Sequence, residues 1–285
     1  MRVYLAGEQF MGVADKVHRR LFSYWYNRKN PKHIIQAADW GQDLFLDSGA
    51  FTAFTLKKVI DPKSYAEFIH EHGHLFNTLS SLDVIGNAQG SYDKLKEMES
   101  LGCKVQPVYH AREDESWLKR YIDEGYDYIF IGGMVPETTG WLMGWLDDLF
   151  DRILSNPDGT PRVKLHGFGL TDQQLMFRYP WYSVDSTSWL FTGSFGGCVF
   201  MTDWGLKKIT FSLDSPSAKN ENAPYYFNLS AMEQRQIDGW LERHGVTAQQ
   251  CAEHYKHRNV VNSTTFYEME VLASPVYKRT QMTLF

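Results

Sequence analysis

Short apolar runs alternate with helix-like segments along most of this chain of 285 residues. Candidate strands occupy residues 3–6, 44–47, 79–84, 104–109, 128–132, 163–168 and 181–185, with a last one at 198–201 or 209–211. Between the strands, apolar residues recur at helical spacing, and Asp61-Pro62 is a typical start of one such helix. The repeated alternation predicts a parallel sheet, and at this length a (β/α)8 TIM-type barrel.

An open, doubly wound sheet is the alternative architecture. Its dinucleotide-binding form carries Gly-x-Gly-x-x-Gly after the first strand, and this sequence has no such pattern there. Beyond residue 212 the chain becomes polar and turn-rich, and then helical, with candidate capping boxes starting at Ser230 and Thr247. We therefore predict a barrel catalytic domain over residues 1–212 and a short helical C-terminal extension over residues 213–285 that packs on the barrel.

Composition restricts the class of protein. The net charge of −5 argues against holding nucleic acid by bulk electrostatics, although a local basic face would suffice. The three cysteines are scattered and form no disulfide framework, which is typical of a reducing compartment. The N-terminus has no signal-peptide pattern, and no apolar run is long enough to span a membrane. These features predict a soluble cytoplasmic protein.

The predicted strand ends carry the residues that can do chemistry. They are Asp47, Asp83, His110, Gly132, Gly133, Met134, His166, Gly167, Phe168, Gly169 and Asp185. In a barrel the carboxyl ends of all strands meet at one mouth, so we expect these residues to converge. Glycine there admits a flat ligand, and a carboxylate can accept hydrogen bonds from an exocyclic amine and a ring N–H together. The set therefore favours a purine-like base, with one acid as nucleophile and another as acid/base.

Four segments in this order resemble the tRNA-guanine transglycosylase superfamily. Residues 46–51, Leu-Asp-Ser-Gly-Ala-Phe, are similar to the family's Asp-Ser-Gly-Gly-Phe motif. Residues 131–134 and 165–169 resemble its Gly-Gly-Leu and Gly-Val-Gly strand ends, and residues 183–186 fall where it has a Phe-Asp-Cys nucleophile segment. Ala50, in place of the second glycine, and the altered C-terminal part look more like the phage and bacterial branch that acts on DNA.

The resemblance implies a reaction that replaces guanine in DNA by a 7-deazaguanine such as preQ0. Asp185 would attack C1′ of the sugar and form a covalent intermediate, Asp47 would transfer the proton of the base, and Asp83 would grip the base. His110 stands near the place of a family glutamine. The implied base pocket comprises Ser48, Gly49, Phe51, His110, Gly132, Gly133, Met134, His166 and Gly167 together with Asp83.

The sequence departs from the tRNA enzymes in the zinc cluster. Those enzymes hold a structural zinc through Cys-x-Cys-x-x-Cys and a histidine, and this spacing does not occur here. Cys251, His254 and His257 recur every three residues, but a tetrahedral site needs a fourth ligand. We therefore predict no metal and no cofactor.

Other functions stay open at this point. The same exchange on tRNA is the nearest alternative, and a catalytically silent nucleic-acid-binding barrel or a barrel hydrolase acting on a small nucleoside are others. Asp47-Ser48 can also be a simple strand-to-helix turn, and Phe51, Phe54 and Met134 can be packing residues. The predicted partners are the 7-deazaguanine base and DNA, either single-stranded or with the target base flipped out, and no membrane.

Overall fold

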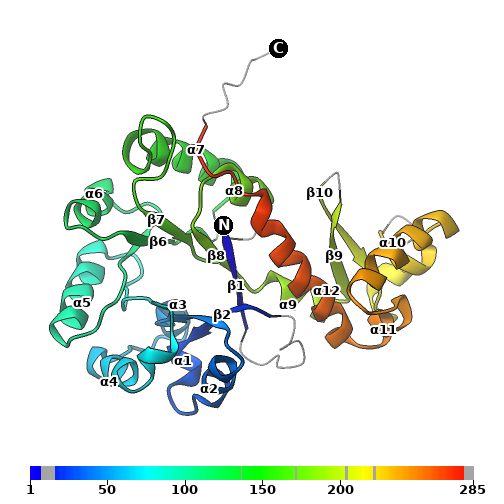
Figure 1. Ribbon diagram of the computed structural model, residues 1–285, viewed down its shortest axis with the longest axis horizontal. Coiled ribbons are helices and arrows are strands. Elements are labelled where there is room, and N and C mark those ends of the chain that lie inside the picture. Colours follow the sequence, from blue (N-terminus) through cyan, green and yellow to red (C-terminus); the bar gives the residue numbers. More distant parts are fainter. Residues whose placement is uncertain (8–16, 136, 171, 203–204, 221–222, 279–285) are drawn as a thin grey trace. The chain divides into compact units, whose positions relative to one another are not determined.

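The computed structural model describes residues 1–7, 17–135, 137–170, 172–202, 205–220 and 223–278 (Figure 1). Its contacts divide the chain into two compact units. The first comprises Met1–Glu8, Arg19–Ser186 and Leu272–Phe285, and the second comprises Gln9–His18 and Thr187–Val271. Each unit is described by itself.

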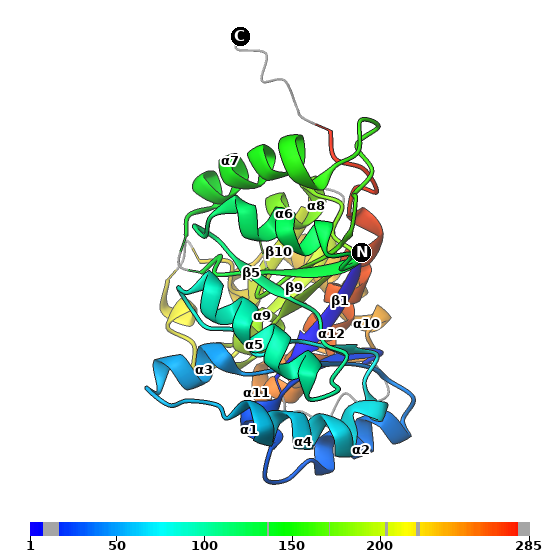
Figure 2. The ribbon, with the colours of Figure 1, turned by 90° about the vertical axis from the view of Figure 1, so that its left-hand side faces the viewer.

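The first unit is a mixed α/β fold built on one parallel sheet. Its strands are β1 (Arg2–Ala6), β2 (Arg19–Ser23), β3 (Asp43–Asp47), β4 (Thr78–Leu79), β5 (Val108–His110), β6 (Tyr128–Gly132), β7 (Lys164–Gly167) and β8 (Ser183–Ser186). Its α-helices are α1 (Tyr24–Asn27), α2 (Lys32–Asp39), α3 (Ala50–Thr55), α4 (Pro62–His72), α5 (Ala88–Ser100), α6 (Glu115–Asp123), α7 (Thr139–Leu149) and α8 (Gln173–Arg178). Figures 1 and 2 show α4, α5, α6 and α7 on the outside of this sheet.

The eight strands follow the order β4-β3-β2-β1-β8-β7-β6-β5, and every neighbouring pair is parallel. The edge strands β4 and β5 share no ladder. One parallel bridge, Ser80 with Gln106, links the segments beside them, and the N–H of Gln106 donates to Leu79 O at 2.9 Å. The predicted eight-stranded parallel α/β fold is therefore confirmed, but the described residues form a curled, TIM-like half-barrel rather than a barrel closed by a full ladder.

One strand of the sheet was missed from the sequence. β2 begins with two arginines, which hide its apolar character from a search for continuous apolar runs. Arg20 is nevertheless buried, donates from Nη2 to Gly7 O at 2.8 Å and lies over the Phe22 ring. The long side chain thus places its charge against a carbonyl and an aromatic face, which makes an arginine tolerable inside a strand.

The strand predicted at residues 198–201 or 209–211 does not belong to the parallel sheet. β9 (Gly197–Thr202) and β10 (Gly205–Thr210) pair with each other, antiparallel, as a separate two-stranded sheet in the second unit. Both predicted segments are strands, but they form the two arms of one hairpin. The assignment of either to the barrel was wrong.

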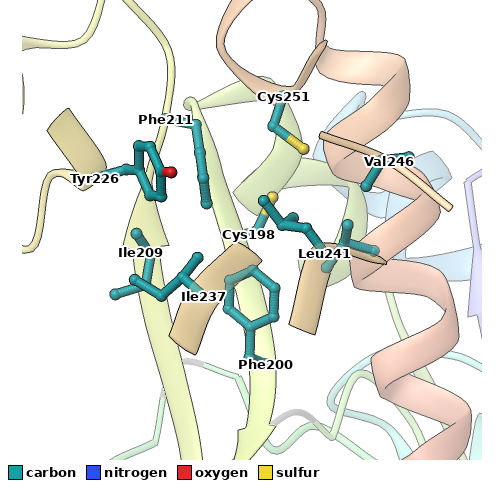
Figure 3. Close-up of a cluster of buried hydrophobic side chains, with 10 residues drawn as sticks. Cys198, Phe200, Ile209, Phe211, Tyr226, Ile237, Leu241, Val246 and Cys251 are labelled. Atoms are coloured by element: carbon teal, nitrogen blue, oxygen red, sulfur yellow. The ribbon is translucent and has the colours of Figure 1, made fainter. Parts of the chain in front are cut away.

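The second unit combines this hairpin with α9 (Ser188–Ser194), α10 (Ala231–Arg243), α11 (Ala248–Glu253) and α12 (Tyr255–Glu268). Figure 3 shows its apolar core, in which Cys198 and Phe200 of β9 meet Leu241 of α10 and Cys251 of α11. Because the hairpin and the helices share this core, they form one unit, and the division falls after Ser186 instead of at the predicted boundary after residue 212.

Local signals for the helix starts are confirmed. Asp61 caps α4 by accepting from the Ser64 N–H at 3.1 Å, with proline at the first helical position. The predicted capping boxes at Ser230 and Thr247 open α10 and α11.

Candidate functional site at the carboxyl ends of the strands

Aromatic rings fill the concave side of the parallel sheet. Phe45 of β3 packs on Phe130 of β6 and on His166 of β7, with ring centroids 5.0 and 4.5 Å apart. Tyr4 of β1 joins them, 5.4 Å from Phe45. Side chains two residues apart on a strand lie on the same face. The next residue on this face toward the carboxyl end is therefore Asp47 on β3.

The same alternation places the other strand-end residues. His110 follows Val108, Gly132 follows Phe130, and Asp185 follows Ser183, which is hydrogen-bonded to His166. Four predicted site positions, Asp47, His110, Gly132 and Asp185, thus occupy the interior face at the carboxyl ends of their strands. The aromatic layer below them forms the floor of the candidate site.

Asp185 is held on one side only. Its Oδ1 accepts the Gly169 N–H at 2.7 Å and lies 3.3 Å from Nε2 of His166, while the side chain is 10% exposed. Within the described part of the chain, Oδ2 accepts no hydrogen bond. One oxygen therefore orients the carboxylate, and the other is available for a reaction partner.

His166 is fully buried and connects Asp185 to a hydroxyl chain. Its Nδ1 lies 2.6 Å from Ser183 Oγ, which in turn lies 2.5 Å from the Tyr128 hydroxyl. Burial lowers the pKa of His166, and the hydrogen bond to Asp185 offsets only part of that effect. In a neutral ring, Nε2–H donates to Asp185 and Nδ1 accepts from Ser183. Every polar group of this hydrogen-bonded network then has a partner.

Asp47 ends β3 at a tight turn into α3. Its Oδ2 accepts the Gly49 N–H at 3.0 Å, and Ser48 Oγ accepts the Ala50 N–H at 3.2 Å. Gly49 has φ +78°, and a Cβ on it would lie 2.5 Å from both Ser23 Oγ and Trp25 Cβ. Only glycine fits this position, so the turn that orients Asp47 depends on it.

Asp83 and His110 form a buried polar cluster with a residue that the sequence did not single out. His110 Nε2 lies 2.9 Å from Asp83 Oδ2, and Nδ1 lies 3.1 Å from Glu113 Oε1. Ser48 Oγ donates to the other oxygen of Asp83 at 3.2 Å. Both oxygens of Asp83 already have protein partners, so a bound base would use their remaining lone pairs.

His110 is the cation of this cluster. Burial alone would lower the pKa of His110, but the hydrogen bonds to Asp83 and Glu113 outweigh burial and raise its pKa to about 9. The imidazolium therefore lies between two carboxylates whose side chains are 9% and 8% exposed. The cluster combines one positive and two negative groups and is charged at neutral pH.

The stability of the protein should fall as the pH rises through about 9. His110 gains protons on folding because its pKa rises from 6.5 to about 9, so its contribution is complete below pH 6.5 and is lost as the pH passes the folded-state value. The loss should be about 3 kcal/mol at most. Urea unfolding between pH 6 and 9.5 measures it. A His110→Leu variant should lack this pH-dependent component, and an identical slope in both proteins would contradict the assignment.

The glycines of the site pack mainly against its own side chains. A Cβ on Gly132 would lie 2.9 Å from His110 Cδ2, and Gly133, at φ +68°, faces His110 Cβ at 3.1 Å. A Cβ on Gly167 would meet Leu170 at 3.0 Å. The absence of a Cβ at these three positions leaves space for the side chains of His110 and Leu170. Met134 is also buried, whereas Phe51 is 60% exposed on α3.

Sequence reasoning missed three members of the site. Glu113 lies three residues after His110, in the loop that leads into α6, and this spacing was the one available signal for it. Ser183 and Tyr128 bond to each other and to His166 from neighbouring strands. Their pairing depends on strand order, which the sequence does not display.

A cavity of about 580 Å³ lies away from this site. Arg2, Lys164 and Tyr182 line it, at or before the amino-terminal ends of β1, β7 and β8. Its cations already have partners, since Arg2 lies 3.5 Å from Asp43, Lys164 lies 3.3 Å from Asp127, and Arg162 Nη1 donates to Ile153 O at 3.1 Å. We assign no chemistry to it because the strand-end carboxylates lie at the other end of the sheet.

Over the residues that the structure describes, no three His, Cys, Asp or Glu side chains are grouped to hold a metal ion. Cys251 faces the apolar core of the second unit instead. No helix in the described ranges is both long enough and apolar enough to cross a membrane.

The site thus belongs to a mixed α/β protein with acidic and imidazole groups at the carboxyl edge of a parallel sheet. Comparison with models of known families and with curated proteins finds no match to this chain.

Proposed function

We propose that this protein exchanges guanine in DNA for a 7-deazaguanine base, with the curled sheet acting as a TIM-type barrel and Asp185 as the nucleophile. Asp185 Oδ2 attacks C1′ of the nucleotide, the C1′–N9 bond breaks, and its electron pair stays on guanine N9, which takes a proton from the Asp47 carboxyl group. The incoming 7-deazaguanine gives its N9 proton to Asp47. Its N9 then attacks C1′ and releases the Asp185 carboxylate.

The observation that carries this proposal is that only one carboxylate oxygen of Asp185, Oδ1, has hydrogen-bond donors among the described residues. A carboxylate that forms a glycosyl intermediate needs one oxygen directed at the sugar and a donor set that stabilises it as a leaving group. The Gly169 N–H and His166 supply those donors on Oδ1, and Oδ2 accepts nothing from the described residues. The low pKa of buried His166 keeps it neutral, so it acts as a hydrogen-bond donor that orients Asp185.

Asp47 suits the proton transfer. It lies on the same interior face as Asp185 and is oriented by the Gly49 N–H. Asp83 is the proposed anchor for the base, because its position is maintained by Ser48 and by the His110 cation. Gly132 and Gly133 support this anchor, because the absence of a Cβ there leaves room for the His110 side chain that contacts Asp83.

DNA is preferred to tRNA as the polymer on two grounds. The resemblance over residues 46–51 includes the alanine found in the DNA branch, and the cysteine spacing of the zinc-holding tRNA enzymes does not occur. A catalytically silent barrel would have no need for a carboxylate oriented through one oxygen, so we favour an enzyme.

Base exchange should be detected directly. DNA and tRNA containing radiolabelled guanine are incubated separately with the protein and preQ0, and the released label and the incorporated base are measured. We expect release from DNA and incorporation of preQ0 in equal amount. Release from tRNA alone would assign the enzyme to the tRNA reaction, and release from neither polymer would overturn the proposal.

A further inference from the structure

Helix α3 presents apolar side chains to solvent beside the candidate site. Phe51 is 60% exposed, Phe54 is 58% exposed, and Val59 in the following segment is 91% exposed. The two phenylalanines are three residues apart, so they lie on one face of the helix. Within the described ranges, neither ring packs on another aromatic ring. Most of the surface of these two large rings is therefore exposed to solvent in the folded chain.

Two lysines follow three residues after Phe54. Lys57 and Lys58 are exposed, and neither forms an ion pair with a described residue. Residues 50–60 contain no Asp or Glu, so the positive charge is not compensated within the segment. The surface formed by Phe51, Phe54, Lys57 and Lys58, which we call the α3 surface, therefore combines flat apolar rings with unpaired cations.

Lys57 occupies a backbone conformation that favours glycine. Its φ is +52°, and its N–H donates to Phe54 O at 3.0 Å as the helix ends. A glycine at this helix end would avoid the strain of the left-handed region. A lysine in this backbone conformation destabilises the folded chain. The positive charge of Lys57, and not its backbone preference, is therefore the property that binding would use.

The α3 surface adjoins Asp47, the proposed acid/base. Asp47, Ser48 and Gly49 form the turn from β3, and α3 starts at the next residue. The close approach of Gly49 to Ser23 and Trp25 restricts the direction in which the helix leaves the sheet. Figure 2 shows α3 in light blue. A polymer whose target base reaches Asp47 must therefore continue past the beginning of this helix.

We propose that the α3 surface binds single-stranded DNA, with Phe51 and Phe54 stacked on unpaired bases next to the target nucleotide and Lys57 and Lys58 on its phosphates. The inference rests on the proposed function for its choice of DNA as the polymer. Exposed rings next to cations commonly bind single strands, because an unpaired base offers a free face for stacking. In a duplex both faces of each base are covered by its neighbours, so the rings favour the single strand.

Binding can be measured without any base exchange. Fluorescence anisotropy of a labelled single-stranded 20-mer and of its duplex gives both affinities for the full chain. We expect the single strand to bind more tightly. Phe51→Ala/Phe54→Ala should weaken single-strand binding by about 10-fold or more, in line with the contribution of base stacking. Trp40→Ala is the matched control and should bind as wild type, because Trp40 is an exposed aromatic residue that precedes the amino end of β3.

Lys57→Gly separates binding from folding. We expect it to weaken single-strand binding and to lower the slope of log K against log salt by about 0.7, the value for one lost phosphate contact. Its thermal unfolding midpoint should stay equal or rise, because glycine relieves the positive φ. Wild-type affinity in both variants, or tighter binding of the duplex, would overturn the inference.

The two proposals fail in different ways. An Asp185→Asn protein should keep the binding of the single strand and its dependence on the α3 surface. If the α3 variants lose binding while the wild type exchanges no base, the surface is supported and the proposed function is rejected. If the wild type exchanges bases and the α3 variants bind as tightly as it does, the surface is rejected and the function stands.

Discussion

Asp185→Asn should abolish base exchange, with a loss of at least about 10³-fold, as expected for removal of a nucleophile. The amide has nearly the shape of the carboxylate and can keep the contact with the Gly169 N–H, but it cannot form the ester to C1′. The labelled-guanine assay measures the rate. A denaturation-resistant adduct between protein and DNA, trapped by omitting the incoming base, should disappear from the variant.

A second aspartate provides the control for this experiment. Asp127 is 76% exposed and lies just before the amino end of β6, away from the candidate site. Asp127→Asn should retain exchange and adduct at the wild-type level. An adduct that persists in Asp185→Asn would show that another group attacks the sugar, and Asp47 would then be the next to test.

His110→Leu should destabilise the protein by about 3–5 kcal/mol at pH 7, the usual cost of removing one partner from a buried ion pair. The leucine removes the cation and leaves Asp83 and Glu113 facing each other in a site where their side chains are 9% and 8% exposed. Urea unfolding at pH 7 measures the change in the free energy of unfolding.

A double variant in which both carboxylates are replaced by amides isolates the electrostatic part of this effect. In Asp83→Asn/Glu113→Gln there is no pair of carboxylates to repel each other, so adding His110→Leu should cost much less than it does in the wild type. An equal cost in both backgrounds would mean that the loss comes from packing, and the ion cluster would not be a major source of stability. A cost below 1 kcal/mol in the wild type would also contradict it.

Predictions from the sequence succeeded where local chemistry decides the structure. The caps at Asp61, Ser230 and Thr247 were predicted because a side chain and a backbone N–H three residues apart need no distant partner. Asp47 and Asp185 were placed at strand ends because strand alternation and the parallel sheet follow from periodicity. The alternation of strands and helices also predicted a parallel sheet and seven of its eight strands.

Predictions from the sequence were wrong where contacts between distant segments determine the structure. β2 was missed because the burial of Arg20 depends on Gly7 and Phe22, and periodicity alone does not show that an arginine can be satisfied in this way. The hairpin β9–β10 was assigned to the barrel because its apolar runs look alike whether they pair with parallel strands or with each other. Its shared core with α10 and α11 is a tertiary property.

The sequence by itself placed Asp47 and Asp185 at the carboxyl edge of the sheet, since strand alternation depends on neighbouring residues, but it did not identify Glu113. The tertiary structure decided their roles. It joined Asp185 to His166 and Gly169, and it set His110 between Asp83 and Glu113. The pKa of each histidine then follows from burial and from these partners, so one ring is neutral and the other charged although the two residues have the same chemistry.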